Sequence, residues 1–314
     1  MSAVLVTGAG GFVGRATAAA LLAAGHSVTG TGRHPGRVPP GVAPLAVDLL
    51  ADPAALPATI RALRPEILVH GAWTTEHGRY WNDAANLDWT ARTLEIVRAF
   101  AEAGGRRIVT VGTCAEYDWT ALGGAPCRET STPLQPHTLY GAAKHATAEL
   151  VGAFCRSAGL GHAHARLFML YGDGEQPERL VPGVIRALLA GRPAKVTSGA
   201  QVRDLMDVRD AGAALAALAG SDRRGPVNVA TGLPVTIREV VATIGQLVGR
   251  PELVELGAIP DRPDDPAFLV AEVEVLAQQV GFRPAIALRQ GLSEAVDSWR
   301  AGRGGADHDR RGSR

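Results

Sequence analysis

The sequence predicts an α/β fold in which a doubly wound parallel sheet is joined by a smaller α+β lobe. Short apolar runs, such as AVLVT at 3–7 and ILVH at 67–70, alternate with longer helical stretches rich in Ala and Leu. These runs lack the alternation of a half-exposed strand, as expected for parallel strands covered by helices on both faces. Strands and helices in strict alternation build right-handed βαβ units, and such units form a doubly wound sheet.

The elements follow one another without a break through residue 170. Strands are expected at 3–7, 27–31, 44–47, 66–70, 107–111 and 163–170. Helices are expected at 12–24, where Gly25 ends the helix, and at 53–63, 83–103 and 138–158.

The texture changes after residue 171, where Pro and Gly become frequent and the elements shorten. Further helices are expected at 178–190, 209–219, 236–248 and 288–300. We therefore predict a first domain over 1–170 that also receives 205–230, and a second lobe from 171–204 and 231–300. Residues 301–314 contain few apolar side chains, which predicts a disordered tail.

Composition excludes several classes of protein. Lys+Arg 32 against Asp+Glu 31 gives a net charge of +1, which provides no field to attract nucleic acid or an anionic membrane. Cys114, Cys127 and Cys155 lack metal-binding spacing, which indicates a reducing compartment. No apolar run approaches the ~20 residues of a membrane span, and the N-terminus does not resemble a signal peptide. We therefore expect a soluble, cytoplasmic protein. Only two of its basic residues are lysine, Lys144 and Lys195.

A glycine-rich loop lies between the first strand and the first helix. Residues 3–14 read AVLVTGAGGFVG, which contains GxxGxxG. Glycines there permit a tight turn and a close approach of the backbone to a pyrophosphate, whose charge meets the helix N-terminus. The loop predicts a dinucleotide-binding, or Rossmann, domain. Its expected cofactor-binding residues are Gly8, Gly11, Phe12, Val13 and Gly14.

The end of the second strand bears on the choice of nicotinamide cofactor. An acidic residue there would bind the ribose 2′-hydroxyl and favour NAD, but residues 30–34 read GTGRH. Arg33 suits a 2′-phosphate, so NADP(H) is favoured and NAD remains possible. The alternative is that Arg33 is one more solvated loop arginine. Asp48 and Leu49, after the third strand, are expected to face the adenine.

The motif YGAAK brings a phenol and an ammonium together. Tyr140 and Lys144 are four residues apart, on one face of a helix. We expect the ammonium to lower the pKa of the phenol from about 10 and to help it transfer protons nearer neutral pH. Thr113 follows the strand at 107–111, at the sheet edge where α/β proteins bind ligands, and is expected to hydrogen-bond the same substrate oxygen. A surface i,i+4 pair is the alternative for Tyr140 and Lys144.

The chain resembles an extended short-chain dehydrogenase/reductase of the NAD-dependent epimerase/dehydratase family, whose members act on nucleotide-sugars. The resemblance reaches about residue 300 and lies in TGAGGFVG, ILVHGAW, ANLDWTARTLE, VGTCAEYD, YGAAK, RLFMLYGDG, QVRDLMDVRD and DRPDDP. It implies that Thr113, Tyr140 and Lys144 are catalytic. The further cofactor contacts that it implies are Gly71, Ala72 and Asn86. It also implies a homodimer built from the helices at 83–103 and 138–158.

The resemblance implies a substrate-binding set and includes departures from the family pattern. Arg203 and Arg262 would grip the substrate diphosphate, unless either is a surface arginine. Met169 is expected in the substrate site, where the family often has Asn. Cys114 and Ala115 follow Thr113 where the dehydratases of the family carry an Asp-Glu pair, so dehydration is disfavoured.

The stretch WTTEHGRYW at 73–81 is rich in aromatic and hydrogen-bonding side chains. In this fold such a loop lies over the nicotinamide and the sugar. The residues expected to contact substrate are Trp73, Thr74, Glu76, His77 and Tyr80. Trp73 and Trp81 would either cover a hexose face or pack under the following helix.

The remaining histidines are given structural roles. His70 is expected to be structural or near the pyrophosphate, and His162 and His164 to lie at a sheet edge. No metal site is expected from the sequence.

These features lead to one main hypothesis for function. The protein would be a ketoreductase that transfers hydride from NADPH to a keto-deoxyhexose carried by a nucleotide (an NDP-4-keto-hexose). One alternative is a nucleotide-sugar epimerase with tightly held NAD, which needs the same Thr113, Tyr140 and Lys144. A minor alternative is an NADP-sensing protein without turnover.

Overall fold

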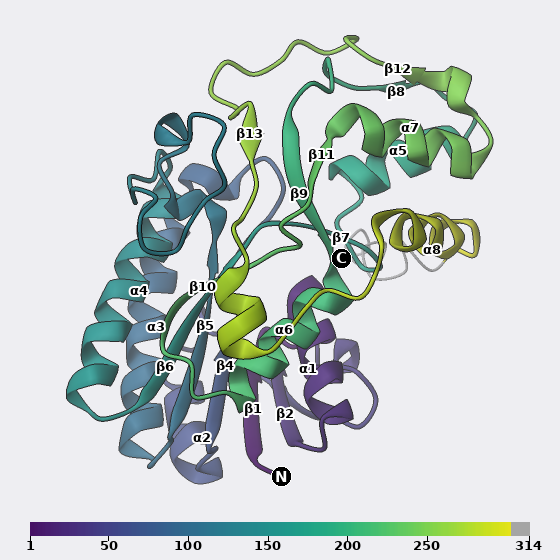
Figure 1. Ribbon diagram of the computed structural model, residues 1–314. Coiled ribbons are helices and arrows are strands. Elements are labelled where there is room, and N and C mark those ends of the chain that lie inside the picture. The colour runs from purple at the N-terminus through teal and green to yellow at the C-terminus, as the bar shows by residue number, and fades with distance from the viewer. Residues whose placement is uncertain (303–314) are drawn as a thin grey trace.

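The computed structural model describes residues 1–302, and its larger part is a sheet of seven parallel strands. The strand order is β3-β2-β1-β4-β5-β6-β10 (Figure 1). The chain winds outward from β1 in both directions, so the predicted doubly wound sheet is confirmed. The strands are β1 (Ala3–Thr7), β2 (Ser27–Gly32), β3 (Ala43–Ala46), β4 (Ile67–His70), β5 (Arg107–Thr113), β6 (Gly161–Leu167) and β10 (Gly225–Val229).

Helices cover both faces of this sheet. Val4 and Val6 of β1 pack into one core and Leu5 into another, because successive side chains of a strand point to opposite faces. The first core is covered by α1 (Phe12–Ala23) and α6 (Val208–Gly220). The second is covered by α2 (Ala55–Leu63), α3 (Ala85–Glu102) and α4 (Leu139–Ser157). Burial on both faces explains the unbroken apolar runs of the strands.

The second lobe is built on a four-stranded sheet beside the carboxyl ends of the large one (Figure 1). Its strands are β7 (Met169–Tyr171), β9 (Val202–Asp207), β11 (Pro234–Thr236) and β13 (Phe268–Leu269), and β8 (Ala194–Lys195) pairs with β12 (Val254–Glu255). Its core is enclosed by α5 (Leu180–Leu189), α7 (Ile237–Val248) and α8 (Leu288–Arg300). The single-turn helices of the chain are η1 (Pro35–Arg37), η2 (Tyr80–Asn82), η3 (Cys114–Glu116), η4 (Trp119–Ala121), η5 (Pro251–Leu253) and η6 (Leu276–Val280).

One strand expected from the sequence is two separate strands in the structure. The prediction of a strand over 163–170 is wrong, because β6 ends at Leu167 and β7 begins at Met169. Leu167 is the last residue of β6 with partners in both β5 and β10. Beyond it those neighbours end, so the chain turns away and β7 pairs with β9 of the lobe.

The environment of β6 also differs from the expectation. This strand lies between β5 and β10. His162 and His164 are therefore buried inside the sheet, and the prediction that they lie at a sheet edge is wrong.

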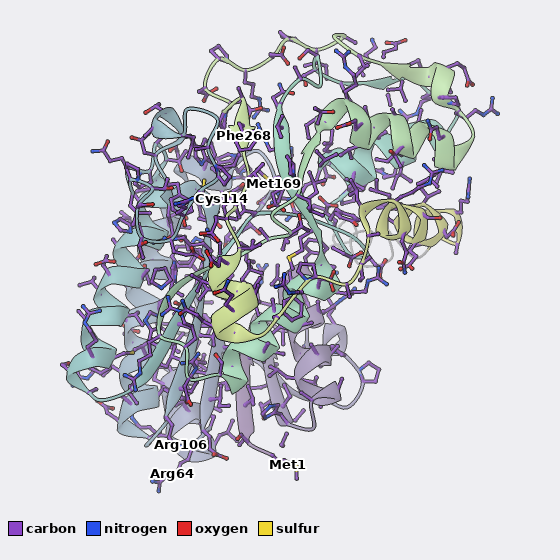
Figure 2. The ribbon with its side chains drawn as sticks, in the orientation of Figure 1. Met1, Arg64, Arg106, Cys114, Met169 and Phe268 are labelled. Carbon is purple, nitrogen blue, oxygen red and sulfur yellow. The ribbon has the colours of Figure 1, made fainter. Side chains whose placement is uncertain are left out.

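The lobe lies beside the carboxyl ends of the strands (Figure 1). Figure 2 shows Cys114, Met169 and Phe268 between the two parts of the chain, far from Met1 and Arg106 at the opposite end of the sheet. Of the segment 205–230, α6 and β10 belong to the large sheet, whereas β9 belongs to the lobe. The tail predicted to be disordered spans 301–314, and from residue 303 onward it lies outside the described residues. No helix within residues 1–302 is long and apolar enough to cross a membrane.

Candidate active site

The glycine loop between β1 and α1 has the geometry of a pyrophosphate cradle. Gly8 has a φ of +74°, a conformation that glycine adopts most readily. A Cβ on Gly14 would overlap the carbonyl oxygen of Gly8, so no side chain fits at position 14 without a shift of the loop. Gly11 is the N-cap of α1 and has no side chain to accept from the first-turn N–H groups. These free donors and the helix dipole suit an anion, so the loop fits the pyrophosphate of a dinucleotide.

The adenosine end of the predicted cofactor site lies beside this loop. The Ala9 N–H donates to Thr31 O (2.9 Å), which ties the loop to β2. Arg33 follows β2 directly and its side chain is exposed. Asp48 Oδ1 accepts from the backbone N–H groups of residues 50 and 51 at 3.0 and 3.1 Å, and Leu49 is buried.

The three predicted catalytic residues meet at the carboxyl edge of the sheet. Thr113 is the last residue of β5, and Tyr140 and Lys144 lie in the first turns of α4. The Thr113 side chain acts on Tyr140 and opposes the rise of its pKa. Lys144 Nζ donates to the carbonyl oxygen of Val111 (2.8 Å), which fixes the start of α4 against β5. A phenol, a hydroxyl and an ammonium are thereby gathered at one point.

The predicted lowering of the Tyr140 pKa is wrong. Burial raises the pKa of Tyr140, and the neighbouring Tyr80 raises it further, while the Thr113 side chain opposes both effects. Burial also lowers the pKa of Lys144 to about 7, against the attraction of Glu116. Tyr140 is 8% exposed and Lys144 is 5% exposed, and burial is the largest influence on the pKa of each group.

An aromatic cluster surrounds Tyr140. Its phenol ring makes edge contacts with the rings of Tyr80, Trp81 and Trp73, with centroid distances of 4.9, 5.9 and 6.4 Å. Ala115 packs into the same cluster, at a position where the dehydratases of the resembled family carry an acid. The Tyr140 ring therefore packs against aromatic rings and the methyl group of Ala115.

Two side chains of α3 hold the loop at 73–81 in place. Trp73 Nε1 donates to Asn86 Oδ1 (2.8 Å), and Asn86 Nδ2 donates to the carbonyl oxygens of Tyr80 and Asp83 (2.8 Å each). The Asn86 amide nitrogen therefore binds the end of the loop and the turn that follows it, although Asn86 is predicted to contact the cofactor. Trp73 also stacks on Trp89 of α3, with ring centroids 6.1 Å apart.

The other predicted residues of this loop occupy different environments. Thr74 Oγ1 accepts from Trp89 Nε1 (2.9 Å). Glu76 and His77 are exposed, and Glu76 forms an ion pair with Arg79 at 3.5 Å. The lobe reaches this loop through Gln176. Its two hydrogen bonds, from the N–H of residue 77 and to the carbonyl of residue 75, are 2.9 Å each. Gln176 was not predicted from sequence, because nothing local marks a contact between residues so far apart along the chain.

The predicted substrate-binding residues of the lobe lie on β7, β9 and the loop at 261–266. Arg203 is buried and donates to Asp265 Oδ1 (2.5 Å) and to the carbonyl oxygen of Pro266 (2.7 Å). Arg262 is exposed. The pKa of His77 is lowered chiefly by its partial burial, and the charge of Arg262 contributes to this lowering. Met169 packs against the apolar cluster that contains Cys114 (Figure 2). Arg203 therefore binds the same loop that contains Arg262.

The buried histidines form polar links between strands and helices. His70 Nδ1 pairs with Thr7 Oγ1 (2.8 Å) and its Nε2 with Thr93 Oγ1 (2.9 Å), and burial lowers the pKa of His70 to about 3. His162 and His164 share Thr110 Oγ1 at 2.8 Å each. Within residues 1–302 no group of three or more His, Cys, Asp or Glu side chains is arranged to hold a metal.

Glu116 is a buried acid of this site that sequence reasoning missed. Its side chain accepts from the N–H of Thr113 (2.8 Å), and Thr113 Oγ1 accepts from the N–H of Ala115 (3.2 Å). The spacing Thr113-x-x-Glu116 is that of a capping box, a signal that the sequence does carry.

Comparison with known proteins identifies the family. The model of the NAD dependent epimerase/dehydratase family matches residues 4–230. The chain belongs to this family. The predicted resemblance is confirmed, and the protein is an enzyme of the extended short-chain dehydrogenase/reductase type.

Individual members of the family resemble the chain over nearly its whole length. The dTDP-6-deoxy-L-talose 4-dehydrogenase (NAD(P)(+)) of Kitasatospora kifunensis is 31% identical over 305 residues, 93% of each chain. The UDP-glucose 4-epimerase of Streptomyces lividans is 30% identical over 328 residues, 94% of each chain. The solved complex of the Thermus thermophilus UDP-glucose 4-epimerase with NAD is 27% identical, with a TM-score of 0.83, over 95% of this chain and 98% of that one.

Proposed function

We propose that the protein is an NADPH-dependent ketoreductase that reduces the 4-keto group of a nucleotide-activated deoxyhexose. The observation that carries the proposal is the pairing of Thr113, Tyr140 and Lys144 with a non-acidic Cys114-Ala115 sequence. The family relative from Kitasatospora kifunensis supports it, since that enzyme is named for dehydrogenation at C4 of a 6-deoxysugar nucleotide with NAD(P)+.

Tyr140 is assigned the proton donation that reduction requires. Its raised pKa keeps the phenol protonated at neutral pH, which suits an acid that delivers a proton to a nascent alkoxide. Thr113 would hydrogen-bond the same oxygen and polarise the carbonyl. Lys144 would bind the nicotinamide ribose and, as an ammonium, stabilise the phenolate left on Tyr140 after the transfer.

The cofactor would lie along the carboxyl edge of the large sheet. When bound, the reduced nicotinamide supplies the hydride. The loop from Gly8 to Gly14 would hold the pyrophosphate, and Arg33 would pair with the 2′-phosphate of NADPH. Asp48 and Leu49 would face the adenine, and Gly71 and Ala72 the nicotinamide half.

The substrate would lie between the aromatic loop and the lobe. Arg203 and Arg262 would hold the diphosphate, with the ion pair between Arg203 and Asp265 exchanged for a phosphate oxygen. Trp81 and Met169 would contact the sugar. A ring of aromatic side chains about Tyr140 suits a deoxysugar, because a methyl group needs no hydrogen-bond partner.

Dehydration is not supported as the activity. It needs an acid and a base beside the sugar, and neither Cys114 nor Ala115 provides one. Burial raises the pKa of the Cys114 thiol to about 12, which removes it as an acid or base near neutral pH. Glu116 is ionised but fully buried and paired with His164 and Arg166.

The first experiment identifies the cofactor. The purified protein is denatured, any released dinucleotide is identified by chromatography, and the native protein is titrated with NADPH and NADH. An empty protein that prefers NADPH, and that oxidises it with a nucleoside diphosphate 4-keto-6-deoxyhexose, supports the proposal. Tyr140→Phe should lose most of this turnover and keep NADPH binding; a Tyr140→Phe variant with unchanged turnover would remove the proposed proton donor.

The second candidate is a nucleotide-sugar 4-epimerase. It is favoured by the two epimerases that resemble the chain over more than nine-tenths of its length, and it uses the same Thr113, Tyr140 and Lys144. An epimerase regenerates its NAD in each cycle and keeps it bound. Release of stoichiometric NAD on denaturation would therefore contradict the assignment as a ketoreductase and support that as an epimerase.

A further inference from the structure

We propose that Glu116 is a positioning residue that fixes Thr113 for its contact with the reacting oxygen and presents a buried negative charge toward Lys144. The inference rests on the proposed function, because that function gives Thr113 and Lys144 their roles. Glu116 itself lies behind Thr113 and touches neither cofactor nor substrate in this assignment.

Two hydrogen bonds hold Thr113, and Glu116 makes the one to its backbone. The Thr113 N–H donates to Glu116 Oε1 (2.8 Å), while Thr113 Oγ1 accepts from the Ala115 N–H (3.2 Å). These two bonds close a capping box over the single turn η3. Thr113 is thereby held in place near Tyr140, whose pKa it lowers against burial.

The carboxylate is itself anchored to the sheet. His164 Nε2 lies 2.9 and 3.0 Å from its two oxygens, and Arg166 Nε donates to Oε2 (3.0 Å). Both partners belong to β6, whose ladder with β5 runs as far as Thr113. Glu116 is fully buried, so these charge-assisted bonds lie in a low-dielectric setting.

Gly112 supplies an independent sign that space is reserved for this carboxylate. A Cβ on Gly112 would overlap both Glu116 Oε1 and the ring of His164. The residue before Thr113 therefore has to lack a side chain for Glu116 and His164 to meet. Its φ is not positive, so close approach and not backbone conformation favours glycine.

The charge on Glu116 acts on the catalytic pair. Although burial alone would raise the pKa of Glu116, His164 and Arg166 hold it well below its usual range, so the group is a carboxylate. Its charge raises the pKa of Lys144 against burial and helps to keep Tyr140 protonated. The titratable groups that face it are Cys114, Tyr140, Lys144, His164 and Arg166.

The central test is Glu116→Gln, which keeps the shape of the side chain. The amide has a single oxygen, which Arg166 attracts, so the NH2 group turns toward the Thr113 N–H and that bond is lost. We expect kcat for the keto-sugar nucleotide to fall about 10- to 100-fold, because small misplacements of a reacting group have effects of that size. The Kd for NADPH and the KM for the sugar nucleotide should change less than about twofold, since Glu116 contacts neither.

Glu129→Gln is the matched control. Glu129 is also a buried carboxylate, and its Oε1 accepts a single backbone N–H, that of Asn228 (2.9 Å), but it makes no contact with Thr113. We expect this variant to keep kcat within about twofold even if its midpoint of thermal unfolding falls. A kcat loss in Glu129→Gln equal to that in Glu116→Gln would mean that general destabilisation explains both, and would overturn the proposal.

A second readout does not depend on turnover. The chain has only two lysines, the buried Lys144 and the exposed Lys195, so 13C-labelled lysine gives two resonances to titrate. Glu116→Gln should shift the pKa of Lys144 downward, with the resonance of the exposed Lys195 as the internal reference. The amide proton of Thr113 should also move upfield when its carboxylate acceptor is lost.

The two readouts separate failure of this inference from failure of the proposed function. If the natural protein reduces no keto-sugar but Lys144 and the Thr113 amide respond to Glu116→Gln, the proposed function fails and the placement of Glu116 stands. If kcat, the pKa of Lys144 and the chemical shift of the Thr113 amide proton are all unchanged in the variant, Glu116 is not a positioning residue.

A double variant covers the case in which Glu116→Gln does not fold. Loss of one partner from a buried ion pair is strongly destabilising, whereas removal of both charges is often neutral. Glu116→Gln/Arg166→Gln removes both charges of the pair. We expect the same fall in kcat and the same downward shift of the Lys144 pKa as in Glu116→Gln. Normal kcat in the folded double variant would overturn the proposal.

Discussion

Lys144 Nζ lies 3.8 Å from the centroid of the Trp73 indole ring. The indole is held by Asn86 and stacked on Trp89, so the loop after β4 provides a fixed cover for the proposed catalytic lysine. Two opposing effects act on the ammonium. A cation–π contact contributes about 0.5–2 kcal/mol in favour of the charge. Burial prevails, since it lowers the pKa of Lys144 from 10.5 to about 7.

Removing this cover should raise the pKa of Lys144. In Trp73→Ala, water reaches the ammonium and the larger of the two effects, desolvation, is relieved. The 13C titration of Lys144 should move from about 7 toward the ordinary lysine range, with Lys195 as internal reference. Trp119→Ala is the control, since Trp119 contacts Trp81 and not Lys144. A Lys144 pKa that falls in Trp73→Ala would mean that the cation–π contact prevails.

The activity of the enzyme should decline as pH rises through about 7. Lys144 loses its ammonium charge in that range, and with it the partner that stabilises phenolate on Tyr140. The profile of kcat/KM against pH, which reports on the free enzyme, checks this. In Lys144→Arg the side chain stays charged, so the lower remaining activity should no longer decline near pH 7. A profile that is flat from pH 6 to 9 in the natural protein contradicts the assignment.

Acid should destabilise the fold partly through His70. Its pKa in the folded protein is lowered to about 3 by burial, so the stability that it contributes is complete above about 6.5 and is lost as pH falls toward 3. At pH 5.0 the loss is roughly 2 kcal/mol. Urea unfolding at pH 7.5 and 5.0 should show that His70→Gln reduces the pH-dependent loss by about that amount. His34→Gln, on an exposed loop, should leave the difference between the two pH values unchanged.

Arg33 should determine the preference for NADPH. The exposed guanidinium directly follows β2, and a 2′-phosphate there would form a charge-assisted pair. Arg33→Ala should weaken NADPH binding about tenfold or more and leave NADH binding within about twofold, as measured by fluorescence titration. Arg98→Ala, on the exposed face of α3, serves as a control for general loss of positive charge. Equal effects on the two cofactors would remove Arg33 from the 2′-phosphate site.

The protein should form a homodimer through α3 and α4. Leu87 and Leu150 are 60% and 52% exposed on these helices, and burial of the exposed part of each side chain in an interface would stabilise it by about 1–2 kcal/mol. Sedimentation velocity should show a dimer for the natural protein and a shift toward monomer for Leu150→Glu. Leu233→Glu, at a 70% exposed position of the lobe, should leave the dimer intact. A natural protein that sediments as a monomer at micromolar concentration contradicts the prediction.

The sequence by itself determined the features that depend on neighbouring residues. The apolar runs and helical stretches located most elements to within a few residues, because their periodicity is local. The spacing of Gly8, Gly11 and Gly14 defined the loop between β1 and α1. Tyr140 and Lys144 share a helix face wherever that helix lies, so their proximity followed from the chain alone.

Only the tertiary structure decided what depends on distant partners. The break after Leu167 arises where β5 and β10 end, and the burial of His162 and His164 follows from β10 lying beside β6. The pKa of Tyr140 rises, contrary to expectation, because side chains of other elements exclude water from it. Glu116 binds partners 48 and 50 residues away, and desolvation and long-range contacts of this kind have no counterpart in local sequence pattern.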